Sequence, residues 1–123
     1  MTKSVLIVED EINISLPLEY IMKQAGYAVT AVADGEAALD AVASNRPDLI
    51  LLDVMIPKRD GFDVCQTIRA NSSFTGIKII MLTAKGRDVD REKGLALGVD
   101  DFVTKPFSTT DLTARVKKLL GDD

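Results

Sequence analysis

Short apolar runs recur along the chain, and polar residues follow each of them. The clearest is Leu49–Asp53, in which four uninterrupted apolar residues precede a carboxylate, with Pro47 before the run and Pro57 after it. A run this short predicts a strand buried on both faces, as in a parallel sheet, rather than a buried helix. Comparable runs occur at Ser4–Val8, Tyr27–Val32, Ile77–Leu82 and Asp101–Thr104. The sequence therefore predicts five strands.

The segments after these runs have apolar residues at helical spacing. Pro17 lies early in the first of them, so that helix is expected to start near Ser15 or Leu16, or to bend there. The last helix is expected to follow an N-cap within Ser108-Thr109-Thr110-Asp111 and to end at Gly121. The helical segments before the last one are Asn13–Ala25, which contains Pro17, and Glu36–Ala43, Phe62–Ala70 and Asp88–Leu97. Strands that alternate with helices predict one α/β domain over residues 1–123, a parallel sheet with helices on both faces.

Composition narrows the classes of function. The net charge of −4 argues against nucleic-acid binding by general electrostatics, and no apolar run approaches the ~20 residues of a membrane span. The chain has one cysteine and no histidine, which excludes an internal disulfide and histidine-based catalysis. Cys65 lies in an apolar-periodic stretch, which favours a packed core residue over a reactive thiol. A reducing cytoplasm is the expected compartment.

Chemically distinctive residues follow four of the predicted strands. Because all strands of a parallel sheet end at one edge, these side chains are expected to converge there. Three carboxylates in one place repel one another unless a cation neutralises them, and Mg²⁺ does so with oxygen ligands. A metal, a carboxylate nucleophile, a hydroxyl and an ammonium together suit phosphoryl transfer. The residues are Glu9, Asp10, Asp53, Thr83 and Lys105.

The motifs around these residues have a recognisable combination. They are Val8-Glu9-Asp10-Glu11, Leu51-Leu52-Asp53-Val54-Met55-Ile56-Pro57 with Asp60-Gly61, Leu82-Thr83-Ala84, and Gly98-Val99-Asp100-Asp101-Phe102 followed by Lys105-Pro106-Phe107. The chain resembles, over essentially its full length, the CheY-like receiver domains of two-component response regulators, those of the OmpR/PhoB type most of all. This resemblance implies a flavodoxin-like doubly wound (βα)5 fold with strand order 2-1-3-4-5.

The resemblance also implies roles at the site. Asp53 would accept a phosphoryl group from a phosphohistidine on a sensor histidine kinase or phosphotransfer protein. Asp10 and Asp53 would ligate Mg²⁺, with the backbone carbonyl of Met55 as a further ligand. Glu9, which stands where aspartate is commoner, would orient metal-bound water. Enzymatic activity would be limited to a weak, Mg²⁺-dependent loss of the phosphoryl group.

Three further residues would respond to phosphorylation. Lys105 would pair with one phosphoryl oxygen, and Thr83 would move to hydrogen-bond another. Phe102, which replaces the commoner tyrosine, would rotate into the space that Thr83 leaves. Pro106 would follow a cis peptide bond.

The fourth helix, fifth strand and fifth helix would form the output face. The resemblance to OmpR/PhoB-like regulators places Arg91 opposite Asp111, and Asp101 opposite Arg115, across a symmetric dimer. All four residues are present with complementary charge. The competing interpretation is an ordinary solvated charged face.

Other functions remain open at this point. The chain would also suit the receiver half of a DNA-binding regulator whose output domain it does not contain. A flavodoxin-like cofactor protein is disfavoured by the acidic Glu9-Asp10-Glu11, where a flavin phosphate would need amides and hydroxyls. An aspartyl phosphatase would need an acid two residues after its nucleophile, and that position is Met55.

Overall fold

One parallel sheet with helices on both faces forms the molecule. The computed structural model describes residues 2–84 and 87–122. The sheet has the order β2-β1-β3-β4-β5, which confirms the predicted topology. Its strands are β1 (Ser4–Val8), β2 (Ala28–Val32), β3 (Leu49–Asp53), β4 (Lys78–Ala84) and β5 (Asp101–Lys105).

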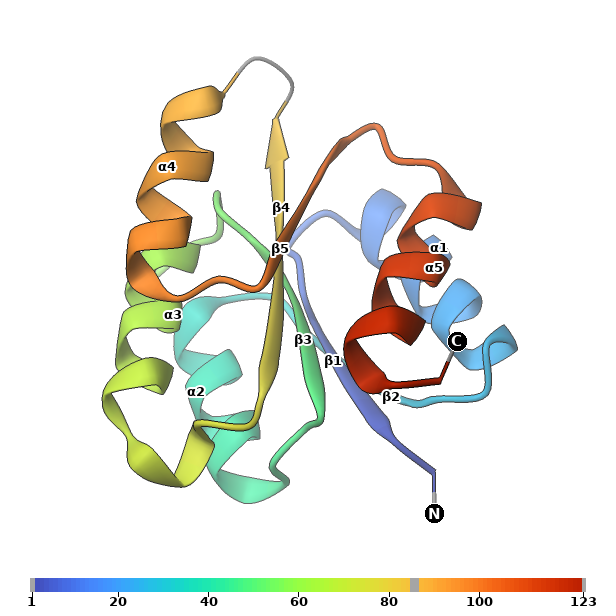
Figure 1. The fold of residues 1–123 in the computed structure, drawn as a ribbon, viewed down its shortest axis with the longest axis horizontal. Coiled ribbons are helices and arrows are strands. Elements are labelled where there is room, and N and C mark those ends of the chain that lie inside the picture. Colours follow the sequence, from blue (N-terminus) through green and yellow to red (C-terminus); the bar gives the residue numbers. More distant parts are fainter. Residues whose placement is uncertain (1, 85–86, 123) are drawn as a thin grey trace.

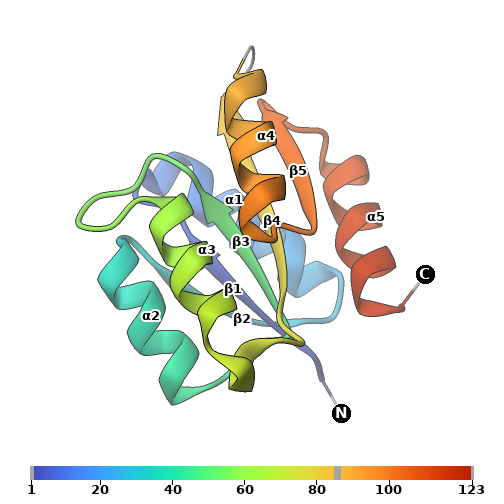
Figure 2. The same cartoon turned by 60° about the vertical axis from the view of Figure 1, so that its left-hand side comes forward.

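The helices divide between the two faces. They are α1 (Ile12–Gln24), α2 (Gly35–Ser44), α3 (Gly61–Ala70), α4 (Asp88–Leu97) and α5 (Thr109–Leu120), with one 3₁₀ turn at Ser72–Phe74. Helices α1 and α5 cover one face of the sheet, and α2, α3 and α4 cover the other (Figures 1 and 2). Within the described residues, no helix is both long and apolar enough to span a bilayer.

Side chains of the central strand β3 pack into the core on both faces of the sheet. Ile50 and Leu52 lie in the cluster beneath α2, α3 and α4, which we call the α2–α4 core. Leu49 and Leu51 lie in the opposite cluster, which we call the α1–α5 core. Alternate side chains of a strand point to opposite faces, so a strand buried on both sides must be apolar throughout. The prediction from the Leu49–Asp53 run is confirmed.

The single cysteine packs in the same way. Cys65 is fully buried in the α2–α4 core, and its Sγ lies 3.5 Å from the carbonyl oxygen of Leu97. Burial raises the pKa of this thiol. A buried thiol with a raised pKa is a poor nucleophile, as the sequence interpretation expected.

Several element boundaries differ from the sequence prediction by a residue, and two differ by more. Helix α1 begins at Ile12, before the expected start at Ser15 or Leu16, and contains Pro17. Proline leaves the carbonyl four residues earlier without its helical donor, but Pro17 and Asn13 are both exposed, so water can serve that carbonyl. Strand β4 extends beyond Leu82 to Ala84 because its last residues pair with β5.

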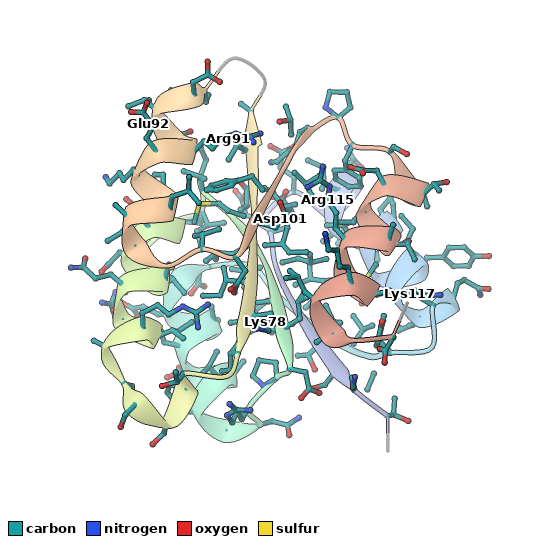
Figure 3. The ribbon with its side chains drawn as sticks, viewed as in Figure 1. Lys78, Arg91, Glu92, Asp101, Arg115 and Lys117 are labelled. Carbon is teal, nitrogen blue, oxygen red and sulfur yellow. The ribbon has the colours of Figure 1, made fainter. Side chains whose placement is uncertain are left out.

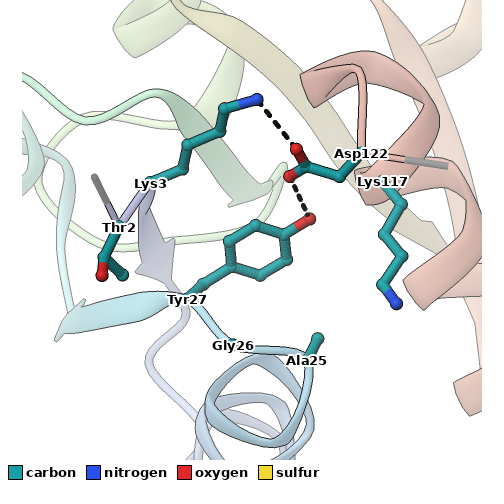
Figure 4. Close-up of a pocket in the computed structure, with 7 residues that line it drawn as sticks. All are labelled: Thr2, Lys3, Ala25, Gly26, Tyr27, Lys117 and Asp122. Carbon is teal, nitrogen blue, oxygen red and sulfur yellow. Dashed lines mark hydrogen bonds and ion pairs between the residues drawn. The ribbon is translucent and has the colours of Figure 1, made fainter.

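Side chains at the start of β1 and of β2 contact the residues that end α5, at the amino edge of the sheet. Asp122 accepts a hydrogen bond from Tyr27 Oη at 2.9 Å, and it forms an ion pair with Lys3 Nζ, also at 2.9 Å (Figure 4). Lys3 also donates to the carbonyl of Leu120. These groups line an open cavity of about 470 Å³. The contacts fix the C-terminal end of α5 beside the start of β1.

The Tyr27 contact predicts a pH dependence of stability. Burial, together with the hydrogen bond to Asp122 and its charge, raises the pKa of Tyr27 from 10.0 to about 12. The folded state therefore holds this proton more tightly, so the contribution is complete below pH 10 and disappears as the pH rises through 12. Urea unfolding should show Tyr27→Phe about 1 kcal/mol less stable than wild type at pH 8, with the gap narrowing above pH 10. A gap that stays constant over that range would contradict this assignment.

Candidate active site at the carboxyl edge of the sheet

Three carboxylates converge where β1 and β3 end. Glu9 and Asp10 follow β1, Asp53 closes β3, and one carboxylate oxygen from each lies within 4.8 Å of the others. The two strands are neighbours, with Val8 beside Leu52, so the next residues along each strand are adjacent. Glu9 and Asp53 are each only 3% exposed, while Asp10 faces solvent. The convergence expected from parallel topology is present.

Lys105 lies over the two buried carboxylates. Its Nζ is 2.6 Å from Asp53 Oδ2 and 3.2 Å from Glu9 Oε1. Each of the three residues follows by two positions a member of the α1–α5 core, so their side chains leave the sheet on the same face. Those core residues are Ile7, Leu51 and Val103.

The proximity of like charges changes the proton affinity of the site. The pKa of Glu9 is raised from 4.5 to about 7, first by burial and then by the hydrogen bond and negative charge of Asp53, while the contacts with Glu11 and Lys105 lower it in part. For Lys105, burial alone would lower the pKa, but the contacts with Asp53 and Glu9 outweigh it and the pKa is raised. The ammonium of Lys105 therefore stays charged. The repulsion between the two buried carboxylates makes Glu9 bind a proton more tightly.

The loop after β3 holds Asp53 from the backbone side. Asp53 Oδ1 accepts a hydrogen bond from the amide of Met55 at 3.0 Å, and the amide of Gly61 donates to the carbonyl of Val54 at 2.9 Å. A Cβ on Gly61 would lie 2.5 Å from the carbonyl oxygen of Asp53, so any other residue there would displace the loop. Lys58 adopts a positive φ of 70° at the tip of this loop. Asp53 is consequently fixed by contacts on both of its oxygens.

The other predicted site residues lie around this cluster. Thr83 is 5% exposed on β4, one position beyond Leu82, which is the register partner of Asp53. Met55 is 73% exposed, so its side chain borders the open side of the site. The peptide bond between Lys105 and Pro106 is cis, which confirms that expectation.

Phe102 lies on the far side of the sheet from the acidic cluster. Its ring is 5% exposed within the α2–α4 core, and the guanidinium of Arg91 lies 5.3 Å from the ring centroid. Met81, its register partner, is two residues before Thr83, so Phe102 and Thr83 face the same side of the sheet. This places the two residues of the predicted switch under the same helix layer.

Three of the four charged residues of the predicted output face, Asp101, Asp111 and Arg115, pair with one another within the chain. Arg115 makes two contacts with Asp101, at 2.8 and 2.9 Å, and one with Asp111 at 3.0 Å. Figure 3 shows Arg91, Asp101 and Arg115 together on α4, β5 and α5. Pairs across a dimer, as the sequence interpretation proposes, would have to exchange with these internal ones.

One residue at this face had no role in the sequence interpretation. Gly94 lies inside α4 directly against the Phe102 ring. The available signal was a glycine in the interior of a predicted helix, which is unfavourable there and often marks a close packing contact.

The donor set of the acidic cluster suits a hard cation. Glu9, Asp10 and Asp53 offer only carboxylate oxygens, and Asp10 and the Met55 region are open to solvent. Mg²⁺ uses one or two carboxylates and retains several waters, whereas softer metals prefer nitrogen or sulfur ligands. The residues present therefore fit Mg²⁺.

Comparison with known proteins gives consistent matches. The sequence model of the response regulator receiver domain matches residues 5–117. The alkaline phosphatase synthesis transcriptional regulatory protein PhoP of Bacillus subtilis is 46% identical over 120 residues, which are 98% of this chain and 49% of that protein. The chain thus spans about half the length of this curated relative.

Two solved structures illustrate the match in three dimensions. The chemotaxis response regulator CheY4 of Vibrio cholerae is 30% identical with a TM-score of 0.90, covering 97% of this chain and 99% of that one. The receiver domain of the sensor histidine kinase PA1611 from Pseudomonas aeruginosa is 34% identical with a TM-score of 0.90, covering 98% and 99%. That structure has a magnesium ion coordinated in its active site cleft.

Proposed function

Since this chain belongs to the response regulator receiver domain family of two-component systems, we propose that Asp53 is its phosphoryl acceptor. The observation that carries the proposal is the position of its carboxylate. It is buried at the end of β3, held by Lys105 and flanked by Glu9 and Asp10. A carboxylate held in this position at the carboxyl edge of the sheet suits nucleophilic attack on a phosphoryl group.

The residues around Asp53 divide the work of binding and charge neutralisation. Asp10, Asp53 and the Met55 carbonyl would hold Mg²⁺, and Glu9 would orient a water bound to it. The ion would offset the repulsion between the carboxylates and the incoming phosphoryl oxygens. The Nζ of Lys105 pairs with Asp53 before transfer and would pair with a phosphoryl oxygen afterwards. The Asp53 oxygen forms the new bond to phosphorus as the bond from phosphorus to the donor nitrogen breaks.

Phosphorylation of Asp53 would change the conformation of Thr83 and Phe102. The phosphoryl group would add negative charge beside Lys105. Thr83, one position beyond the register partner of Asp53, would move to hydrogen-bond that group, and this movement would change the space available to Phe102. This is a shift between two populated states driven by a local charge. The α4–β5–α5 face is proposed as the surface that partners read, including a second copy of the chain with the contacts Arg91–Asp111 and Asp101–Arg115.

The role of the chain in a larger protein is a second part of the proposal. Residues 1–123 would form one receiver domain that a histidine kinase or phosphotransfer protein phosphorylates in the cytoplasm. The name of the Bacillus relative identifies a transcriptional regulator about twice as long. The chain would then be the receiver half of such a regulator, with DNA binding performed by a domain outside it.

Mg²⁺-dependent phosphorylation tests this proposal. The protein should gain one phosphoryl group from a small phosphoryl donor with Mg²⁺ and none in excess chelator, as read by intact mass. Slow loss of that mass with Mg²⁺ would reveal the weak autophosphatase activity, and size-exclusion chromatography of the same sample reports dimerisation. Equal uptake with and without the metal would contradict the proposed metal site.

A further inference from the structure

Gly94 has a packing partner that explains its place inside a helix. A Cβ at this position would lie 2.7 Å from Cε1 and 2.8 Å from Cζ of Phe102. Its φ is not positive, so backbone freedom is not the reason for glycine. A glycine lowers the stability of a helix interior, and α4 accepts that cost where the ring makes its closest approach.

Arg91 covers the same ring from one turn earlier on α4. Residues three apart on a helix share a face, so Arg91 and Gly94 both face β5. The guanidinium lies 5.3 Å from the centroid of Phe102, a distance at which a cation is attracted to an aromatic face. Asp101, the preceding residue on β5, points the other way, to Arg115 on α5. The Phe102 ring therefore lies on the α4 side of the sheet, where both Gly94 and Arg91 approach it.

We propose that Gly94 and Arg91 form a seat that positions the Phe102 ring beneath α4. The absence of a side chain at Gly94 admits the ring, and Arg91 closes over it. This inference rests on the proposed function, because the seat then couples the Thr83 side of the sheet to the output face. Gly94 is thus a positioning residue of the switch and takes no part in the chemistry at Asp53.

The change in melting temperature caused by Gly94→Ala should have opposite signs in wild type and in the Phe102→Leu variant. In wild type, Gly94→Ala should lower the melting temperature, because the new methyl group collides with Cε1 and Cζ of Phe102. In a Phe102→Leu background, where no atom extends as far as Cζ, the same change should raise the melting temperature through helix propensity. Stabilisation by Gly94→Ala in both backgrounds would overturn the proposal.

Fluorine NMR of the protein labelled with 4-fluorophenylalanine reports the ring itself. The chain has four phenylalanines, and loss of one resonance in Phe102→Leu assigns the signal. Gly94→Ala should change the chemical shift of that resonance only. It should also increase the difference in its chemical shift between H₂O and D₂O, because the displaced ring is more exposed to solvent. Arg91→Gln, which adds no atoms beneath the ring, should increase the same solvent shift in a smaller degree. A Phe102 resonance unchanged in both variants would refute the seat.

Intact-mass measurement of phosphoryl uptake separates this inference from the proposed function. Gly94→Ala should take up the phosphoryl group within about twofold of the wild-type rate, because Asp53 lies on the other face of the sheet. If wild type itself fails to react, the proposed function fails while the fluorine result still decides the seat. A loss of uptake in Gly94→Ala alone would contradict the positioning role.

Discussion

Asp53→Asn is expected to abolish phosphoryl uptake completely, because an amide oxygen is a poor nucleophile and gives no acyl phosphate. The geometry allows no simple substitute. Asp10 is exposed and has no contact with Lys105, while Glu9 is buried behind the ammonium. Intact-mass measurement after treatment with a small phosphoryl donor and Mg²⁺ should show the unmodified mass only.

The control for this change is Asp60→Asn. Asp60 is an exposed carboxylate in the same loop, and it caps α3 through its contact with the amide of Asp63. Asparagine caps a helix about as well as aspartate, so this variant should fold and react like wild type. Phosphoryl uptake by Asp53→Asn, or its loss in Asp60→Asn, would contradict the assignment of the acceptor.

The same substitution has an electrostatic signature at Glu9. Burial raises the pKa of Glu9 to about 7, assisted by the hydrogen bond and charge of Asp53. With asparagine at position 53 the charge contribution is lost and burial remains. The Glu9 pKa should therefore fall below 7 and stay above 4.5, as measured by carbon NMR of its carboxyl group without metal. A pKa that does not fall would mean that Asp53 does not act on Glu9.

Gly61→Ala is expected to lower both stability and the rate of phosphoryl uptake. Its Cβ would lie 2.5 Å from the carbonyl oxygen of Asp53 and 2.9 Å from Cα of Val54, both backbone atoms that cannot rotate away. Overpacking of this kind costs about 1–3 kcal/mol, and the displaced loop also strains the amide contact from Gly61 to Val54. Because Asp53 moves with the loop, the rate of uptake should fall roughly 10–100-fold.

Gly76→Ala provides the matched control. The nearest atom to its Cβ is Nη2 of Arg46 at 3.0 Å, the end of a flexible exposed side chain. Its stability, measured by urea unfolding, should lie within about 0.5 kcal/mol of wild type, with uptake unchanged. Equal effects of the two glycine substitutions would show that the contact with Asp53 has no special consequence.

The sequence predicted best those features that depend on burial alone. Strand β3 has the same bounds in the sequence prediction and the structure because an uninterrupted apolar run records burial on both faces. Helix α1 starts at Ile12, earlier than the start near Ser15 or Leu16 that was one of the two expectations, because Pro17 removes the donor of only one carbonyl and that part of the helix is exposed to water. The extension of β4 to Ala84 depends on pairing with β5, which is a long-range hydrogen bond pattern that periodicity does not record.

The sequence allowed us to predict which residues make up the candidate site, but not which of them contact one another. Parallel topology brings Glu9, Asp10 and Asp53 together wherever the strands end, so their convergence followed from the strand predictions. That Lys105 contacts both buried carboxylates depends on which face each strand end presents, and that follows from register. The fit of Gly94 to Phe102 is a tertiary contact of a kind that helical spacing does not specify.

The most direct test of the central claim is to locate the phosphoryl group. The protein would be phosphorylated with a small donor and Mg²⁺, then treated with borohydride, which reduces an acyl phosphate to an alcohol and releases phosphate. Proteolysis and mass spectrometry would then identify the converted residue. Homoserine should appear at position 53, and no other carboxylate should be converted. Conversion of Asp10 instead, or a phosphorylated protein with no reducible acyl group, would contradict it.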